Sequence, residues 1–196
     1  MPRIRAYVGL GSNVGASEDT LASAIRALDA LPHTRVAGVS RLYATTPVGV
    51  TDQPEFRNAV VALRLTTPGG ELGASGLLAA LKGIERAFGR QVRGHWGPRE
   101  LDLDLLVFGR WSGSVPRFPG TESLDPAKQG LALTVPHPEA HRRLFVLAPL
   151  ADLAPGLAPP GWGETVAMAA ARQRTEEGED AVRPVARWDG RWVELV

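Results

Sequence analysis

The stretch from His95 to Phe108 reads HWGPRELDLDLLVF, and its second half carries the pattern that decides the fold. Apolar and acidic residues alternate from Leu101 to Leu105, a period of two that is typical of a strand with one buried face. The leucines are therefore expected to face the core, while Asp102 and Asp104 share the opposite face. The preceding Gly97–Pro98 pair indicates a turn, because proline cannot donate a hydrogen bond to a sheet.

Two carboxylates on one strand face suggest a metal site. Side chains two apart on a strand are rooted about 6.6 Å apart, close enough to converge on two divalent cations about 3.5–4 Å from each other. Arg99 lies just before them, and an arginine beside metal-binding acids suits a polyphosphate, whose oxygens bind both Mg²⁺ and guanidinium groups. The alternative at this point is a solvent-facing strand with two surface acids.

The totals describe one globular domain spanning residues 1–196. A chain of this length with 44% hydrophobic residues buries a sizeable core. The net charge of +1 gives no indication of a nucleic acid or an anionic membrane as partner. Cysteine is absent, which excludes disulfides and thiolate chemistry. Neither a membrane span nor a signal peptide is evident, so we expect a soluble, cytoplasmic, monomeric protein.

The first half of the chain alternates between strand and helix patterns. Strands are expected at Ile4–Leu10, Arg35–Ala44, Asn58–Leu65 and from Leu101 onward, and helices at Ser17–Leu31, with Ser17 as N-cap, and Glu71–Phe88. This order, βαββαβ, predicts an α+β fold with a ferredoxin-like core, in which helices cover one face of an antiparallel sheet. The other face is expected to be free for a site, together with the loops Thr45–Arg57 and Gly89–Gly97.

The second half is less regular. Arg110–Gly130 has no hydrophobic periodicity and is expected to be an inserted loop that is dispensable for chemistry. The prolines at 136, 138, 149 and 155 are expected to break the following segment into a turn, a short helix and short extended pieces. A C-terminal helix is expected at Glu164–Arg174, and a hairpin at Arg183–Val196 around the Asp189–Gly190 turn.

Four segments together resemble a known family. They are GLGSNVG at 9–15, TTPVGVTDQPEFRNAV at 45–60, WGPRELDLDLLVFG at 96–109 and LTVPHPEAHRRLFVLAPLADLAP at 133–155. In this order they are similar to the 6-hydroxymethyl-7,8-dihydropterin pyrophosphokinase family of folate biosynthesis, also called 2-amino-4-hydroxy-6-hydroxymethyldihydropteridine diphosphokinase. The resemblance covers roughly Ile4 to Pro155.

The resemblance implies a reaction and a set of site residues. ATP would give its β,γ-pyrophosphoryl group to the hydroxymethyl oxygen of the pterin, with AMP leaving and two Mg²⁺ ions held by Asp102 and Asp104. The implied catalytic residues are Arg90, Arg99, Asp102 and Asp104. The implied pterin contacts are Thr45, Pro47, Val48, Phe56, Asn58 and Phe145. The implied ATP contacts are Glu85, Trp96, Arg99, Leu105, Thr134, His137 and Arg143.

The pterin residues also suit a pterin on chemical grounds. Phe56 and Phe145 offer faces for stacking on a flat heteroaromatic ring. Asn58 offers both a donor and an acceptor to a ring edge that needs both. Phe56 is expected to lie in a loop rather than at a core position, and core packing is the alternative for each phenylalanine.

The sequence departs from the family pattern in three places. The loop between Gly89 and Trp96 is one residue shorter, which leaves open whether Arg90 or Arg93 contacts the phosphates. His95 stands where an arginine is often found, and the segment from Arg110 to Gly130 is longer than in compact members.

Two other functional classes remain. A metal-dependent phosphoesterase or nucleotidyltransferase would use the same two aspartates, with a further acid or histidine in the metal shell, but would leave the pterin-like loop unexplained. A ferredoxin-like RNA-binding module would need exposed aromatics on its central strands and a basic face, whereas the strand at Leu101 is acidic.

Overall fold

The computed structural model describes residues 2–46, 52–89, 98–119, 121–122, 130 and 132–195. The first half of the chain forms β1 (Arg3–Ser12), α1 (Ser17–Asp29), β2 (Thr34–Val39), β3 (Leu42–Thr45), β4 (Phe56–Thr66), α2 (Gly70–Ala87) and β5 (Asp102–Phe108). The second half forms β6 (Gly113–Val115), β7 (Leu133–Val135), the 3₁₀ helix η2 (Ala140–Arg142), α3 (Leu144–Leu153), α4 (Val166–Glu177), β8 (Val182–Trp188) and β9 (Trp192–Glu194).

The main sheet has the strand order β5-β1-β4-β3-β8-β9, and β2 also pairs with β4. Every pairing in it is antiparallel, and β1 lies between β4 and β5. The alternation that defined the acidic strand is present in β5, where Leu103 and Leu105 are buried while Asp102 and Asp104 are partly exposed. The predicted α+β, ferredoxin-like class is confirmed.

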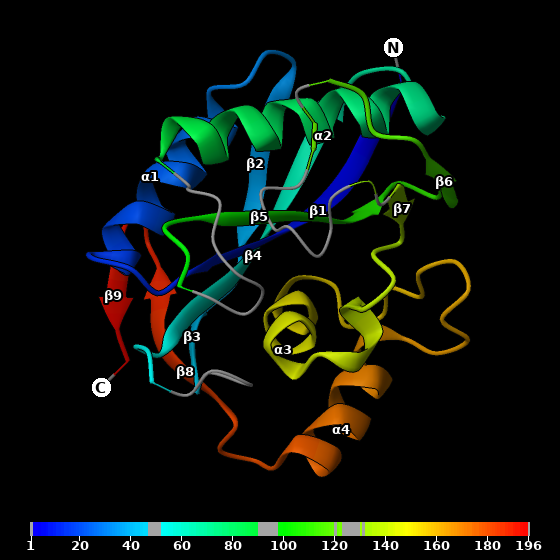
Figure 1. Cartoon of the computed structure of the whole chain (residues 1–196). Helices are drawn as coiled ribbons and strands as arrows, with labels where there is room; N and C mark the ends of the chain where they lie inside the picture. Colours follow the sequence, from blue (N-terminus) through cyan, green and yellow to red (C-terminus); the bar gives the residue numbers. More distant parts are fainter. Residues whose placement is uncertain are drawn as a thin grey trace.

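Helices cover both faces of the sheet, as Figure 1 shows. On one face, α1 and α2 bury their apolar sides against β1, β4 and β5 in the larger core. On the other face, α3 and α4 pack over Tyr7, Val60 and Leu106. The expectation that this second face is free is therefore wrong for much of it. The cause is α3, which is strongly apolar and continues through Pro149 instead of breaking there.

Two local predictions in the first half were wrong. The single strand expected at Arg35–Ala44 divides at Ser40, whose hydroxyl donates to the Arg41 carbonyl at 2.7 Å and accepts from the Val60 N–H at 2.9 Å. The serine therefore replaces ladder bonds at the point where β2 gives way to β3. Ser17 is the first residue of α1 rather than its cap, which is Ala16, and its hydroxyl accepts from Ser12 at 3.1 Å.

The segment expected to be a structureless insertion carries a strand. Strand β6 pairs with β7, matching Val115 with Leu133, and both residues are buried. The lack of periodicity misled the prediction because a three-residue strand is too short to show one.

The C-terminal helix and hairpin are confirmed. Thr165 caps α4 by accepting from the Met168 N–H, and Gly190, at φ 69°, makes the turn between β8 and β9. Strand β8 joins the main sheet beside β3. Within the described part of the chain, no helix combines the length and the apolar character needed to cross a membrane.

Candidate active site

A trough runs along β1, the strand between β4 and β5, because two of its residues are glycines. Gly11 lies between Asn58 on β4 and Asp102 on β5, and Gly9 lies in the same way between Val60 and Asp104. Neither glycine carries a side chain to fill the space between its neighbours. A Cβ added at Gly11 would lie 3.2 Å from Asn58 Oδ1, closer than ordinary contact allows.

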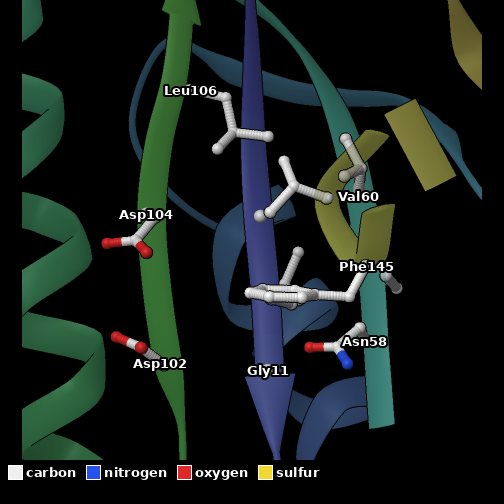
Figure 2. A pocket seen from close by; sticks show the side chains of 11 residues that line it. Gly11, Asn58, Val60, Asp102, Asp104, Leu106 and Phe145 are labelled. Atoms are coloured by element: carbon white, nitrogen blue, oxygen red, sulfur yellow. The ribbon is translucent and has the colours of Figure 1, made fainter. Parts of the chain in front are cut away.

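The first cavity lies over this trough. Figure 2 shows the ring of Phe145, which comes from α3, over β1, with Asn58 on one side and the two aspartates on the other. The side chain of Asn58 is held in place by Thr45, whose buried hydroxyl accepts from Asn58 Nδ2 at 3.0 Å. The cavity is therefore lined by an aromatic face, an oriented amide and two carboxylates, a combination suited to a flat polar ring.

A second cavity, of about 210 Å³, opens on the other side of the same two acids. Its polar lining consists mostly of titratable or charged side chains, with one hydroxyl: Lys82, Arg117, Thr134, His137, Glu139 and Arg143 together with Asp102 and Asp104. Leu78, Leu105 and Leu133 supply an apolar part of the wall. Aspartates 102 and 104 thus form a wall shared by both cavities.

Contacts of Arg99 and Asn13 hold the residues that precede the two acids in place. The Arg99 guanidinium forms an ion pair with Asp102. Its backbone is bound twice by Asn13: the Arg99 N–H donates to Asn13 Oδ1 at 2.8 Å, and the Asn13 N–H donates to the Arg99 carbonyl at 3.1 Å. Asn13 Nδ2 also donates to Gln53 Oε1 at 2.9 Å and to the Pro54 carbonyl at 3.1 Å. One buried side chain therefore links the segments that precede β4 and β5.

His137 faces Asp104 across the second cavity, with Nε2 4.0 Å from Asp104 Oδ2. The Glu139 N–H donates to His137 Nδ1 at 3.3 Å. Because Nδ1 accepts, the proton of a neutral ring lies on Nε2, the nitrogen that faces the acid.

Glu85 lies behind the cavity wall rather than in it. Its fully buried carboxylate accepts from the Leu103 N–H at 2.7 Å and from Lys82 Nζ at 2.8 Å. Lys82, not Glu85, lines the second cavity, and it also donates to the Leu103 carbonyl at 3.2 Å. The direct ATP contact expected of Glu85 remains untested.

The structure separates the expected site residues into two groups. Asn58 and Phe145, expected at the pterin, line the first cavity. Leu105, Thr134, His137 and Arg143, expected at ATP, line the second. Phe56 begins β4 instead of lying in a loop, and alternation places it on the same strand face as Asn58. Several expected residues fall outside the described part of the chain: Pro47, Val48, Arg90, Arg93, His95 and Trp96.

Sequence reasoning missed five residues of the site. Gly9 and Gly11 form the floor of the first cavity, although the sequence analysis used them only as part of the motif at 9–15. Asn13 follows in the same motif. Lys82 was detectable in principle, since a charged residue on the apolar side of a predicted helix needs a buried partner. Arg117 gave no local signal.

Comparisons with known proteins agree with this geometry. The model of the family described as 7,8-dihydro-6-hydroxymethylpterin-pyrophosphokinase (HPPK) matches residues 7–155. A 2-amino-4-hydroxy-6-hydroxymethyldihydropteridine pyrophosphokinase of Pseudomonas aeruginosa is 42% identical over 153 residues, covering 78% of this chain and 82% of the relative. One of the same name from Methylorubrum extorquens is 40% identical over 168 residues, covering 86% and 92%.

Among solved structures, a similar one is wild-type Plasmodium falciparum HPPK-DHPS with pterin and p-hydroxybenzoate. Its TM-score is 0.71 at 14% sequence identity, and the match covers 100% of this chain and 47% of that chain. This chain therefore spans about half the length of that solved protein, and at such low identity the likeness establishes the fold alone. The family model and the sequence relatives decide the classification: the chain belongs to the 7,8-dihydro-6-hydroxymethylpterin-pyrophosphokinase family and is an ATP-dependent diphosphotransferase.

Proposed function

We propose that this enzyme transfers the β,γ-pyrophosphoryl group of ATP to the hydroxymethyl oxygen of 6-hydroxymethyl-7,8-dihydropterin in folate biosynthesis. The observation that carries the proposal is the pair of cavities that meet at Asp102 and Asp104. A transfer between two substrates needs each held on its own side of the reacting atoms, and a wall shared by two cavities meets that need.

The first cavity suits the pterin. The ring would lie on the floor made by Gly9 and Gly11, under the face of Phe145, with Phe56 contributing from the same face as Asn58. Asn58 would bond the edge of the ring. This placement directs the opposite end of the ring, which carries the hydroxymethyl group, toward the aspartates. Thr45 would act indirectly, by orienting the Asn58 amide.

The second cavity suits the nucleotide. Arg143 and His137 would bind phosphate oxygens, Thr134 would offer its hydroxyl, and Leu105 would supply apolar contact. We further propose that Arg90 and Arg99 act on the phosphates and that Trp96 contacts the bound ATP.

The residues present fit magnesium. Among the described residues there is no group of three or more histidines and acids placed to hold a metal, so two aspartates would be the protein's contribution. Mg²⁺ commonly binds through one or two carboxylates, with the rest of its shell made by water and substrate phosphates. Two such ions, when bound, would offset the charge of the triphosphate and make the hydroxyl more acidic.

The reaction balances without a protein base. The hydroxymethyl oxygen forms a bond to the β-phosphorus, the bond from that phosphorus to the α,β-bridging oxygen breaks, and the electron pair leaves with AMP. The hydroxyl proton passes to solvent. The chain's own residues would bind and orient: Asn58 and Phe145 would hold the acceptor, and Asp102 with Asp104 would hold the metals.

Mass spectrometry of the products tests this proposal. ATP with 6-hydroxymethyl-7,8-dihydropterin should give AMP and the pterin diphosphate in equal amounts. ADP with a pterin monophosphate would refute it. Steady hydrolysis of ATP without pterin would instead support the phosphoesterase class.

We also propose that residues 1–196 act as one domain and that the enzyme is a cytoplasmic monomer without nucleic-acid or membrane partners. The pairing of β8 with β3, which ties the C-terminal segment into the main sheet, supports the single domain. Light scattering during gel filtration would test the oligomeric state.

A further inference from the structure

The segment that follows β6 is built around a buried threonine. Thr121 is fully buried, its hydroxyl donates to the Phe118 carbonyl at 2.7 Å and accepts from the Phe118 N–H at 3.0 Å. Its own N–H donates to the same carbonyl at 2.9 Å. These bonds tie Thr121 to Phe118, so these two residues are held in a defined arrangement rather than left in a free loop.

Arg117 is bound to the same threonine and points into the second cavity. Its Nη1 donates to the Thr121 carbonyl at 2.8 Å, and its side chain lines the cavity together with Asp104. Burial lowers the pKa of Arg117, and the nearby carboxylates of Asp104 and Glu85 act against that shift. A half-buried guanidinium is thus held beside one of the two acids of the site.

Charge balance gives this cation a role. A triphosphate carries about four negative charges and two Mg²⁺ ions carry four positive ones, so the two aspartates leave the site with an excess of about two negative charges. Arg99 is paired with Asp102 and offsets one of these two charges, whereas Lys82 is paired with Glu85, which is outside this count. Arg117 and Arg143, which enter the cavity from different segments, are placed to supply the missing positive charge.

We propose that Arg117, contributed by the inserted segment, binds the triphosphate of ATP through its guanidinium group. This inference rests on the proposed transfer from ATP. It gives Arg117 a function in substrate binding, although the segment that carries it was expected to be dispensable for chemistry. A planar guanidinium offers paired donors that match phosphate oxygens, which a lysine does not.

The test compares binding of two nucleotides without turnover. Arg117→Met keeps an unbranched stem but removes the charge, and Arg117→Lys keeps the charge but not the paired donors. Arg110→Met is the matched control, since Arg110 is an exposed arginine in the same segment and lies outside the cavity lining. Calorimetric titrations with an α,β-methylene analogue of ATP and with AMP are run at saturating Mg²⁺.

For Arg117→Met we expect the analogue to bind about 10- to 100-fold more weakly, the loss typical of a hydrogen bond between charged groups. AMP, which lacks the β- and γ-phosphates, should change by less than about threefold, Arg117→Lys should be intermediate, and Arg110→Met should match the parent.

Two results would overturn the inference. Unchanged affinity for the analogue would mean that Arg117 only neutralises the acids in the enzyme without bound nucleotide. An equal loss for both nucleotides would mean that the cavity wall has collapsed. Failure of the parent enzyme to form AMP and pterin diphosphate would instead count against the proposed function, so the two failures are distinguishable.

Discussion

Gly11→Ala tests whether the glycine trough is the pterin site. The added methyl group would lie 3.2 Å from Asn58 Oδ1 and 4.0 Å from Asp102 Cβ, on the surface where the ring is proposed to lie. Asn58 would have to shift by a few tenths of an ångström, which disturbs its bond to Thr45 and its alignment with the ligand. Losing two hydrogen bonds to the pterin, each contributing roughly 0.5–1.5 kcal/mol, weakens binding by about 1–3 kcal/mol.

That range corresponds to a roughly 5- to 150-fold rise in the dissociation constant. The backbone should tolerate the change, because Gly11 is not among the residues with positive φ. Alanine restricts the unfolded chain more than glycine does, a gain of about 0.4–1 kcal/mol in folding stability, and the shift of Asn58 acts against this gain, so the melting temperature should stay close to that of the parent. Weaker pterin binding at an almost unchanged melting temperature is a combination that general damage to the fold would not produce.

The assay is calorimetric titration of 6-hydroxymethylpterin, with and without the ATP analogue, alongside thermal unfolding. Gly76→Ala on α2 is the matched control, because an added Cβ there meets nothing within 4 Å. It should gain stability and bind pterin like the parent. Asn58→Ala should weaken pterin binding by a similar amount while ATP affinity holds. If Gly11→Ala binds pterin within twofold of the parent, the trough is not where the ring lies.

Three further predictions concern the acids, the core and the insertion. Asp102→Asn or Asp104→Asn should lower turnover about 10²- to 10³-fold at saturating Mg²⁺. The melting temperature measured in EDTA should stay the same or rise, because the substitution reduces like-charge repulsion on the strand face. Turnover within tenfold of the parent would contradict the metal role. Burial raises the pKa of Tyr43 above 10, so stability should fall as pH rises above about 10, and Tyr43→Phe should reduce that fall in urea titrations. Replacing residues 111–129 with a Gly-Ser link should weaken binding of the ATP analogue while circular dichroism stays close to that of the parent.

The parts of the fold with strong local signals were predictable from the sequence. The acidic strand shows its period of two over five residues, and the two long helices of the first half have wide apolar faces. The register that places Gly11 between Asn58 and Asp102 joins three distant segments, so no single stretch of sequence contains it.

Other features were hidden because they depend on contacts between distant residues. The proline at 149 favoured a break, yet burial of Leu147 and Leu150 against the sheet stabilises a continuous helix. Arg117 lies in a segment whose composition resembles a free loop, and only its bond to Thr121 directs it toward the acids.

The position of β5 at the end of the strand order explains why two cavities meet there. An edge strand exposes backbone groups that need partners. Here the Glu85 side chain accepts from the Leu103 N–H, the Lys82 side chain donates to the Leu103 carbonyl, and the backbone N–H of His137 donates to the Leu106 carbonyl. No further strand is then required on that side, and the space it would fill is open to the second cavity. Because the two acids lie on an edge strand next to Gly9 and Gly11 of β1, both cavities contact the same two carboxylates, one from each side of β5.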